Sequence, residues 1–137
     1  MQPEDANKQH LTFSKEERIC SKLTIERLFD KQQKVSFYPY RCFYDFTPVT
    51  DEVKVNRILV VVPKRTFKHA VDRNRLKRLT REAWRLHHRQ ELDLHLPDGI
   101  RADLMFYFVG RDLLPYNSIE SKIIEILHRL TKVAESR

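Results

Sequence analysis

Residues 64–89 read KRTFKHAVDRNRLKRLTREAWRLHHR, and this stretch is the most informative part of the sequence. Ten lysines and arginines stand there against two acids, Asp72 and Glu82, which gives the stretch a formal charge of +8. The whole chain carries +7, so the remaining residues sum to −1. The positive charge is therefore concentrated on one segment of the chain.

The same stretch has the periodicity of an amphipathic helix, and Asp72 is a candidate cap for its first turn. Placed at about 100° per residue, its apolar residues fall on one side: Leu76, Leu79, Ala83 and Leu86, with Thr80 and Trp84 on the shoulder of that stripe. The other side carries basic residues at four-residue spacing and few acids to neutralise them. Such a face is tolerated most easily beside a polyanion, so we expect a nucleic acid partner.

Length and composition favour one compact domain. A chain of 137 residues with 41% apolar and 33% charged residues can bury a modest core beneath a polar surface. We expect a flexible tail over residues 1–12, a domain over residues 13–133 and a C-terminal tail over residues 134–137. The first residues lack the apolar core of a signal peptide and no membrane span is visible, so no membrane partner is expected. Two cysteines, Cys20 and Cys42, predict reduced thiols in a cytoplasmic protein.

Three further runs favour strands. The aromatic run 35–47 is interrupted by Pro39, so we expect a short edge segment before the proline and a strand after it. Residues 57–63 and 103–109 contain continuous apolar runs, which is typical of strands buried on both faces. A strand, the basic helix and a strand form a βαβ unit, which implies a parallel pair.

Two more helices complete the pattern. Ser21 is a candidate N-cap for a helix whose Leu28 we expect to pack on the sheet. Asn117 and Glu120 have the spacing of a capping box for a final helix that ends near Lys132. The order is therefore α-β-β-β-α-β-α, a single α+β domain with helices on one mixed sheet.

Catalytic chemistry is not visible in this sequence. His87 and His88 are adjacent on the basic helix and point about 100° apart, so they do not converge on one substrate. Carboxylates do not recur at a spacing that would build a two-metal site, so we predict neither a catalytic residue nor a metal site in the protein itself.

RNA-binding chemistry is abundant. Arginine binds phosphate through two hydrogen bonds and its guanidinium plane stacks on bases, while Asn74 can donate to or accept from a phosphate or base edge. The candidate RNA-binding residues are Lys64, Arg65, Lys68, Arg73, Asn74, Arg75, Lys77, Arg78, Arg81 and Arg85.

Lys64-Arg65 and the run AVDRNRLKRLTREAWR at 70–85 closely resemble the signature of the protein subunit of bacterial ribonuclease P. The core Arg-Asn-Arg-x-Lys-Arg-x-x-Arg-Glu of this signature is specific, and weaker similarity extends from about Phe13 to Val133. The resemblance implies a fold like the second domain of ribosomal protein S5, with a left-handed βαβ crossover that contains the basic helix.

The resemblance also implies a function. The catalyst would be an RNA subunit, which uses Mg²⁺ bound to the RNA to hydrolyse precursor tRNA at the 5′ end of the mature tRNA. The protein would bind this catalytic RNA and the 5′ leader of the precursor, and no dedicated protein partner is predicted.

The positions that line the leader cleft in that family correspond here to Ile25 and Phe29 on the first long helix and to Phe43 on the strand opposite. Ile25 replaces a residue that is usually aromatic. Side chains alternate along a strand, so Phe43 and Tyr44 point to opposite faces of the sheet. A shift of one residue in register would make Tyr44 the cleft residue. Both therefore stay candidates for the leader cleft.

Two alternative functions fit parts of the pattern. One is a free-standing RNA-binding or ribosomal-type protein without an enzyme. The other is a helix-turn-helix protein that reads DNA with the basic helix, although this chain has a strand where that motif has a short helix.

Overall fold

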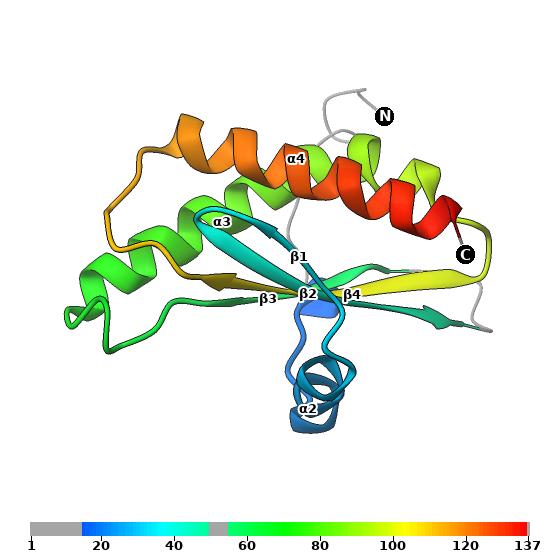
Figure 1. The fold of residues 1–137 in the computed structure, drawn as a ribbon, viewed down its shortest axis with the longest axis horizontal. Coiled ribbons are helices and arrows are strands. Elements are labelled where there is room, and N and C mark those ends of the chain that lie inside the picture. Colours follow the sequence, from blue (N-terminus) through cyan, green and yellow to red (C-terminus); the bar gives the residue numbers. More distant parts are fainter. Residues whose placement is uncertain (1–14, 50–54, 137) are drawn as a thin grey trace, which may run out of the picture.

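The computed structural model describes residues 15–49 and 55–136, in which helices cover both faces of one four-stranded sheet (Figure 1). The elements in chain order are the 3-10 turn η1 (Lys15–Glu17), α2 (Lys22–Lys31), β1 (Lys34–Phe37), β2 (Tyr40–Pro48), β3 (Arg57–Val61), α3 (Ala70–Glu91), the 3-10 turn η2 (Asp93–His95), β4 (Ile100–Phe108) and α4 (Tyr116–Glu135). The predicted order α-β-β-β-α-β-α is confirmed. The predicted N-terminal tail lies outside the described residues.

The sheet is mixed and has the strand order β1-β2-β4-β3. β1 and β2 form an antiparallel hairpin around Pro39, β2 and β4 are antiparallel, and β3 and β4 are parallel. The predicted parallel pair, joined through the basic helix, is therefore confirmed. The chain before α2 lies beside β3, where the Ile19 amide donates to the Ile58 carbonyl at 2.9 Å.

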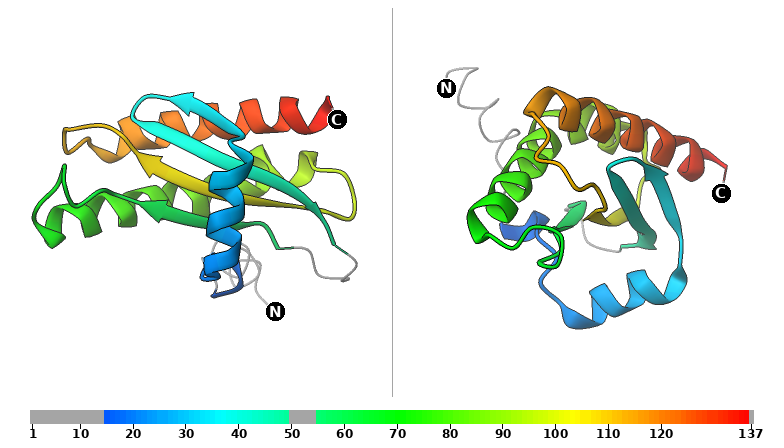
Figure 2. Two further views of the ribbon diagram at one scale, coloured as in Figure 1. Left: turned by 60° about the horizontal axis from the view of Figure 1, so that its bottom comes forward. Right: turned by 60° about the vertical axis from the view of Figure 1, so that its left-hand side comes forward.

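The main core lies between the sheet and the two long helices α3 and α4, which cover the same face (Figure 2). The buried stripe of α3 consists of Leu76, Thr80, Ala83, Trp84 and His88. The predicted stripe is wrong at Leu86, which is 38% exposed, because Trp84 and not Leu86 turns toward the sheet. The Trp84 indole is fully buried and donates to the Glu17 carboxylate at 3.1 Å, which places η1 against α3.

Among the described elements, α2 is the helix that covers the opposite face of the sheet (Figures 1 and 2). Ser21 accepts a hydrogen bond from the Thr24 amide and caps this helix, as predicted, and Leu28 is fully buried on the sheet. The cluster beneath α2 is small: its buried members are Ile19, Leu28, Phe43 and Met105. Because this short helix covers only part of the face, Leu59 and Val61 are half-buried, and the prediction that β3 is buried on both faces is wrong for them.

The ends of the two long helices differ from the sequence-based expectation. α3 begins after His69, so Asp72 lies in its first turn and does not cap it. α4 begins after Pro115, and Asn117 accepts from the Ser118 amide instead of forming the predicted capping box. α4 continues to Glu135 with Ala134 buried, so the predicted tail after residue 133 begins inside the helix. None of the helices in the described ranges is long and apolar enough to cross a membrane.

Candidate nucleic-acid interface

The candidate RNA-binding residues lie in the loop that follows β3 and along α3. Lys64, Arg65 and Lys68 are exposed in the loop, and Asn74 and Arg78 are exposed on the helix. The other candidates are partly buried on the flanks of the stripe that packs on the core: Arg73, Arg75, Lys77, Arg81 and Arg85. The candidate residues of the loop and of α3 are therefore exposed or partly buried, and none of them belongs to the buried core.

Two of these arginines already make contacts within the protein. Arg73 Nη1 donates to the backbone carbonyls of Phe67 at 2.8 Å and Lys68 at 2.9 Å, which fastens the loop to the first turn of α3. Arg85 Nε donates to Glu82 at 3.0 Å, and this hydrogen bond lowers the pKa of the Glu82 carboxyl. Arg73 therefore has a structural role beside any role in binding.

Arg81 faces a second arginine that the sequence analysis did not select. Arg18, just before α2, and Arg81 both line a pocket of about 200 Å³ beside β3, and the exposed residue Cys20 also borders it. Burial, and after it the positive charge of Arg18, lower the pKa of the Arg81 guanidinium. Two guanidinium groups at one pocket create a site where a phosphate would relieve their repulsion.

An aromatic cleft lies on the opposite face, at the edge of α2. The rings of Phe29 on α2 and Phe43 on β2 are 5.2 Å apart at their centroids, and Phe29 is 40% exposed. These two residues line a cleft of about 290 Å³ together with Arg41, Arg65, Tyr107 and Val109. Aromatic faces with flanking arginines suit unpaired bases and their phosphates.

The structure distinguishes among the residues predicted to line this cleft. Phe43 points to the α2 face, so the register predicted without a shift is correct. Tyr44 points to the opposite face, where it packs on the main core, and its ring centroid lies 5.5 Å from that of Phe46. It is therefore not a residue of this cleft. Ile25 packs against the small cluster beneath α2 and does not line the cleft.

Sequence reasoning missed three residues of these surfaces. Arg41 stands two residues before Phe43 and shares its face, so alternation places it in the cleft once Phe43 is there. Tyr107 is the register partner of Arg41 on β4, but the continuous apolar run around it predicts a strand that is buried on both faces. Arg18 precedes α2, and no pattern in the sequence brings it next to Arg81.

The two adjacent histidines diverge, as predicted. His87 Nε2 lies 2.7 Å from Glu120 on α4, whereas His88 Nδ1 lies 2.6 Å from Asp93 and its ring stacks on Trp84. Within residues 15–49 and 55–136, no three His, Cys, Asp or Glu side chains are grouped so that they could hold a metal ion.

Comparisons with known proteins identify relatives across nearly the whole chain. The family model described as Ribonuclease P matches residues 13–131. The ribonuclease P protein component of Porphyromonas gingivalis strain W83 is 32% identical over 118 residues, which covers 86% of this chain and 85% of that protein. The component of Borrelia duttonii is 42% identical over 88 residues, or 64% of this chain and 68% of that one. The solved RNase P protein of Staphylococcus aureus covers 86% of this chain and 97% of its own, with a TM-score of 0.64 at 19% identity, which shows a shared fold.

Proposed function

Because the chain belongs to the ribonuclease P protein family, we propose that its basic surface binds the catalytic RNA of ribonuclease P while its aromatic cleft holds the 5′ leader of precursor tRNA. The chain acts as the protein subunit of a tRNA-processing ribonucleoprotein. The RNA subunit carries the chemistry, and the protein contributes binding and positioning.

This proposal rests on the position of Arg65. Its side chain lines the aromatic cleft on the α2 face, and it stands in the same loop that Arg73 fastens to the start of α3. The cleft and the basic helix are therefore joined through one cationic loop at one end of the sheet. An RNA subunit bound along α3 and a leader strand in the cleft would meet at that loop.

Mg²⁺ belongs to the RNA subunit in this proposal. The buried carboxylates Asp45 and Asp103 are both occupied by arginine side chains, so their donor set does not suit a divalent ion. The protein would instead neutralise phosphates near the reacting centre, which lowers the Mg²⁺ concentration that the RNA needs. We propose the cytoplasm as its site of action.

A processing assay tests this function. Precursor tRNA is incubated with a bacterial ribonuclease P RNA at low Mg²⁺, with and without the protein, and the released leader is quantified. We expect cleavage to require the RNA and to accelerate when the protein is added. Cleavage by the protein alone would contradict the assignment of chemistry to the RNA. Binding of RNA without acceleration would favour a free-standing RNA-binding protein.

A further inference from the structure

Two carboxylates lie directly opposite each other beneath α2. Asp45 on β2 and Asp103 on β4 are partners in the antiparallel register, and they are only 3% and 0% exposed. Like charges at opposed positions destabilise a sheet, and buried carboxylates require cations and hydrogen bonds to compensate for lost hydration. The cationic side chains around these two carboxylates must therefore compensate for their repulsion and for the lost hydration.

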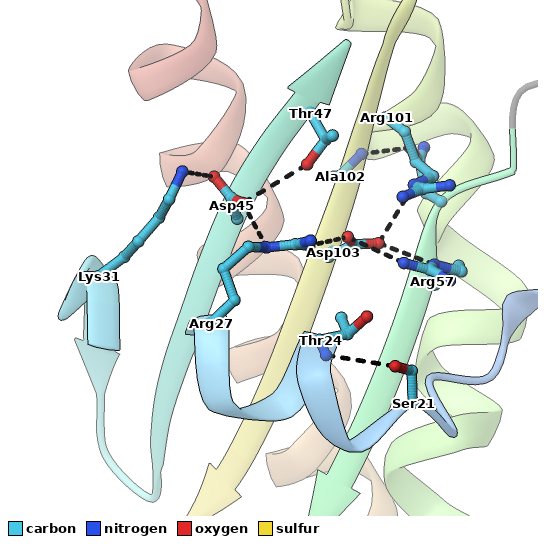
Figure 3. A network of polar contacts seen from close by, with 11 residues as sticks. Ser21, Thr24, Arg27, Lys31, Asp45, Thr47, Arg57, Arg101, Ala102 and Asp103 are labelled. Atoms are coloured by element: carbon cyan, nitrogen blue, oxygen red, sulfur yellow. Dashed lines mark hydrogen bonds and ion pairs between the residues drawn. The ribbon is translucent and has the colours of Figure 1, made fainter. Parts of the chain in front are cut away.

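Arg27 of α2 bridges the two carboxylates (Figure 3). Its Nη2 donates to Asp103 Oδ2 at 2.6 Å, and its Nε lies 2.9 Å from Asp45 Oδ2 as an ion-pair contact. Because the guanidinium group is a rigid planar fork, contact with both acids fixes the helix along and across the strands. Lys31, one turn further along the same helix, lies 2.9 Å from Asp45 Oδ1.

The sheet holds the acceptor side of this arrangement in place. Arg57 of β3 binds Asp103 through two hydrogen bonds, from Nε at 2.9 Å and from Nη2 at 3.1 Å. Arg101 of β4 lies 3.3 Å from the same carboxylate, and Thr47 donates to Asp45 (Figure 3). Asp103 is therefore held by residues of the sheet as well as by α2.

The same two elements carry the aromatic cleft. Phe29 follows Arg27 by two residues on α2, and Phe43 precedes Asp45 by two residues on the same face of β2. Among the described residues, the contacts of α2 with the sheet besides the ion pairs are apolar: the small cluster around Leu28 and the ring contact of Phe29 with Phe43. A displacement of this helix would therefore move Phe29 relative to Phe43. Apolar contact alone is non-directional and does not set that spacing.

We propose that Arg27, held between Asp45 and Asp103, is a positioning residue that sets the geometry of the Phe29–Phe43 cleft for the leader strand. This inference rests on the proposed leader-binding function. The basic helix α3 lies on the other face of the sheet and contacts none of these groups through the interactions described, so its binding of the catalytic RNA is independent of the bridge.

Three variants test the bridge. Arg27→Met keeps an unbranched apolar side chain similar to the aliphatic stem of arginine but lacks the guanidinium group, and Arg27→Lys keeps a charge that reaches only one carboxylate. Lys122→Met is the matched control, because it breaks the exposed 3.3 Å pair with Glu125 on α4. Each is assembled with a catalytic RNA, and KM and kcat are measured for precursors with a long leader and with a one-nucleotide leader. The affinity for the catalytic RNA is measured separately.

Arg27→Met is expected to raise KM for the long-leader precursor by at least about fivefold, with kcat, the short-leader KM and the affinity for the catalytic RNA unchanged. Arg27→Lys should fall between it and the wild type, and Lys122→Met should match the wild type. In the free protein, the nuclear Overhauser contact between the Phe29 and Phe43 rings should weaken in Arg27→Met.

A folded Arg27→Met variant that keeps the wild-type leader preference would overturn the proposal. Equal losses of affinity for the leader and for the catalytic RNA would also overturn it, because they would indicate a general loss of structure. If Arg27→Met does not fold, Arg27→Lys decides: a wild-type leader preference in that variant refutes the bridge. Absence of a leader preference in the wild type would instead refute the proposed leader function.

Discussion

Arg73 donates to the carbonyl of Phe67 across the start of the basic helix, at 2.8 Å. Arg73, the first residue of the Arg-Asn-Arg core motif, therefore holds the loop that precedes its own helix. Phe67 is buried and packs on Phe108, so the loop that Arg73 fastens is also anchored in the main core. Replacing Arg73 is therefore expected to change the shape of the loop as well as any contact with RNA.

Arg78 provides the test of binding alone, because it is exposed and makes no side-chain hydrogen bond or ion pair among the described contacts. Arg78→Ala should weaken binding of the catalytic RNA, leave the free energy of unfolding unchanged, and reduce the slope of log K against log salt by about one. Arg73→Ala should also cost roughly 1 kcal/mol of stability, because it leaves two backbone carbonyls without a donor. Salt-dependent binding and urea unfolding of both variants measure this difference, and equal stabilities would contradict the structural role of Arg73.

Arg18 is expected to bind RNA although it lies outside the signature. Arg18→Gln should weaken binding of the catalytic RNA and lower the salt slope by about one, because Arg18 and Arg81 share a pocket suited to a phosphate. The control is Arg129→Gln, an exposed arginine of α4 that lies near Phe37 and not on α3. If both variants bind with the same slope as the wild type, the shared pocket does not contact RNA.

Phe43 and Tyr44 are neighbours for which different effects on leader binding are expected. Phe43→Ala should weaken the leader-dependent part of precursor binding by about 5- to 150-fold, the range for losing one base–aromatic stack of roughly 1–3 kcal/mol. It should also lower stability, because Phe43 is a buried member of the small cluster beneath α2. Tyr44→Ala should lower stability without changing the leader dependence, because Tyr44 packs on the other face of the sheet. Competition between precursor and mature tRNA measures how much the leader contributes to binding. A change in this contribution in Tyr44→Ala would contradict a leader site on the α2 face of the sheet.

The two cysteines should differ in reactivity. Cys20 is exposed, whereas burial raises the pKa of the Cys42 thiol and keeps it in the unreactive protonated form. Iodoacetamide at about pH 8 should therefore modify one thiol per folded chain and two after denaturation. Mass spectrometry of peptides identifies the sites. Protection of Cys20 by the catalytic RNA would place RNA near the pocket of Arg18 and Arg81, and rapid modification of Cys42 in the folded protein would contradict its burial.

Sequence patterns predict the helices and strands better than they predict which side chains of these elements are buried. The basic helix, the parallel pair and the Ser21 cap follow from periodicity and local hydrogen bonding, and the structure confirms all three. Periodicity predicts Leu86 in the buried stripe of α3, whereas the structure buries Trp84 and exposes Leu86. Helical spacing cannot decide between Leu86 and Trp84, because the contact of Trp84 with Glu17 joins residues that are distant in the chain.

A cationic helix between two apolar strands, with an arginine-rich signature along it, could be inferred from the chain's residues, because charge and periodicity are properties of neighbouring residues. The folded structure was needed to place Phe43 on the α2 face, to show which basic side chains are exposed, and to bring Asp45 and Asp103 together beneath Arg27. Those outcomes depend on strand pairing and on the packing of α2 against the sheet. Such contacts form between residues that are far apart in the sequence, so patterns among neighbouring residues do not predict them.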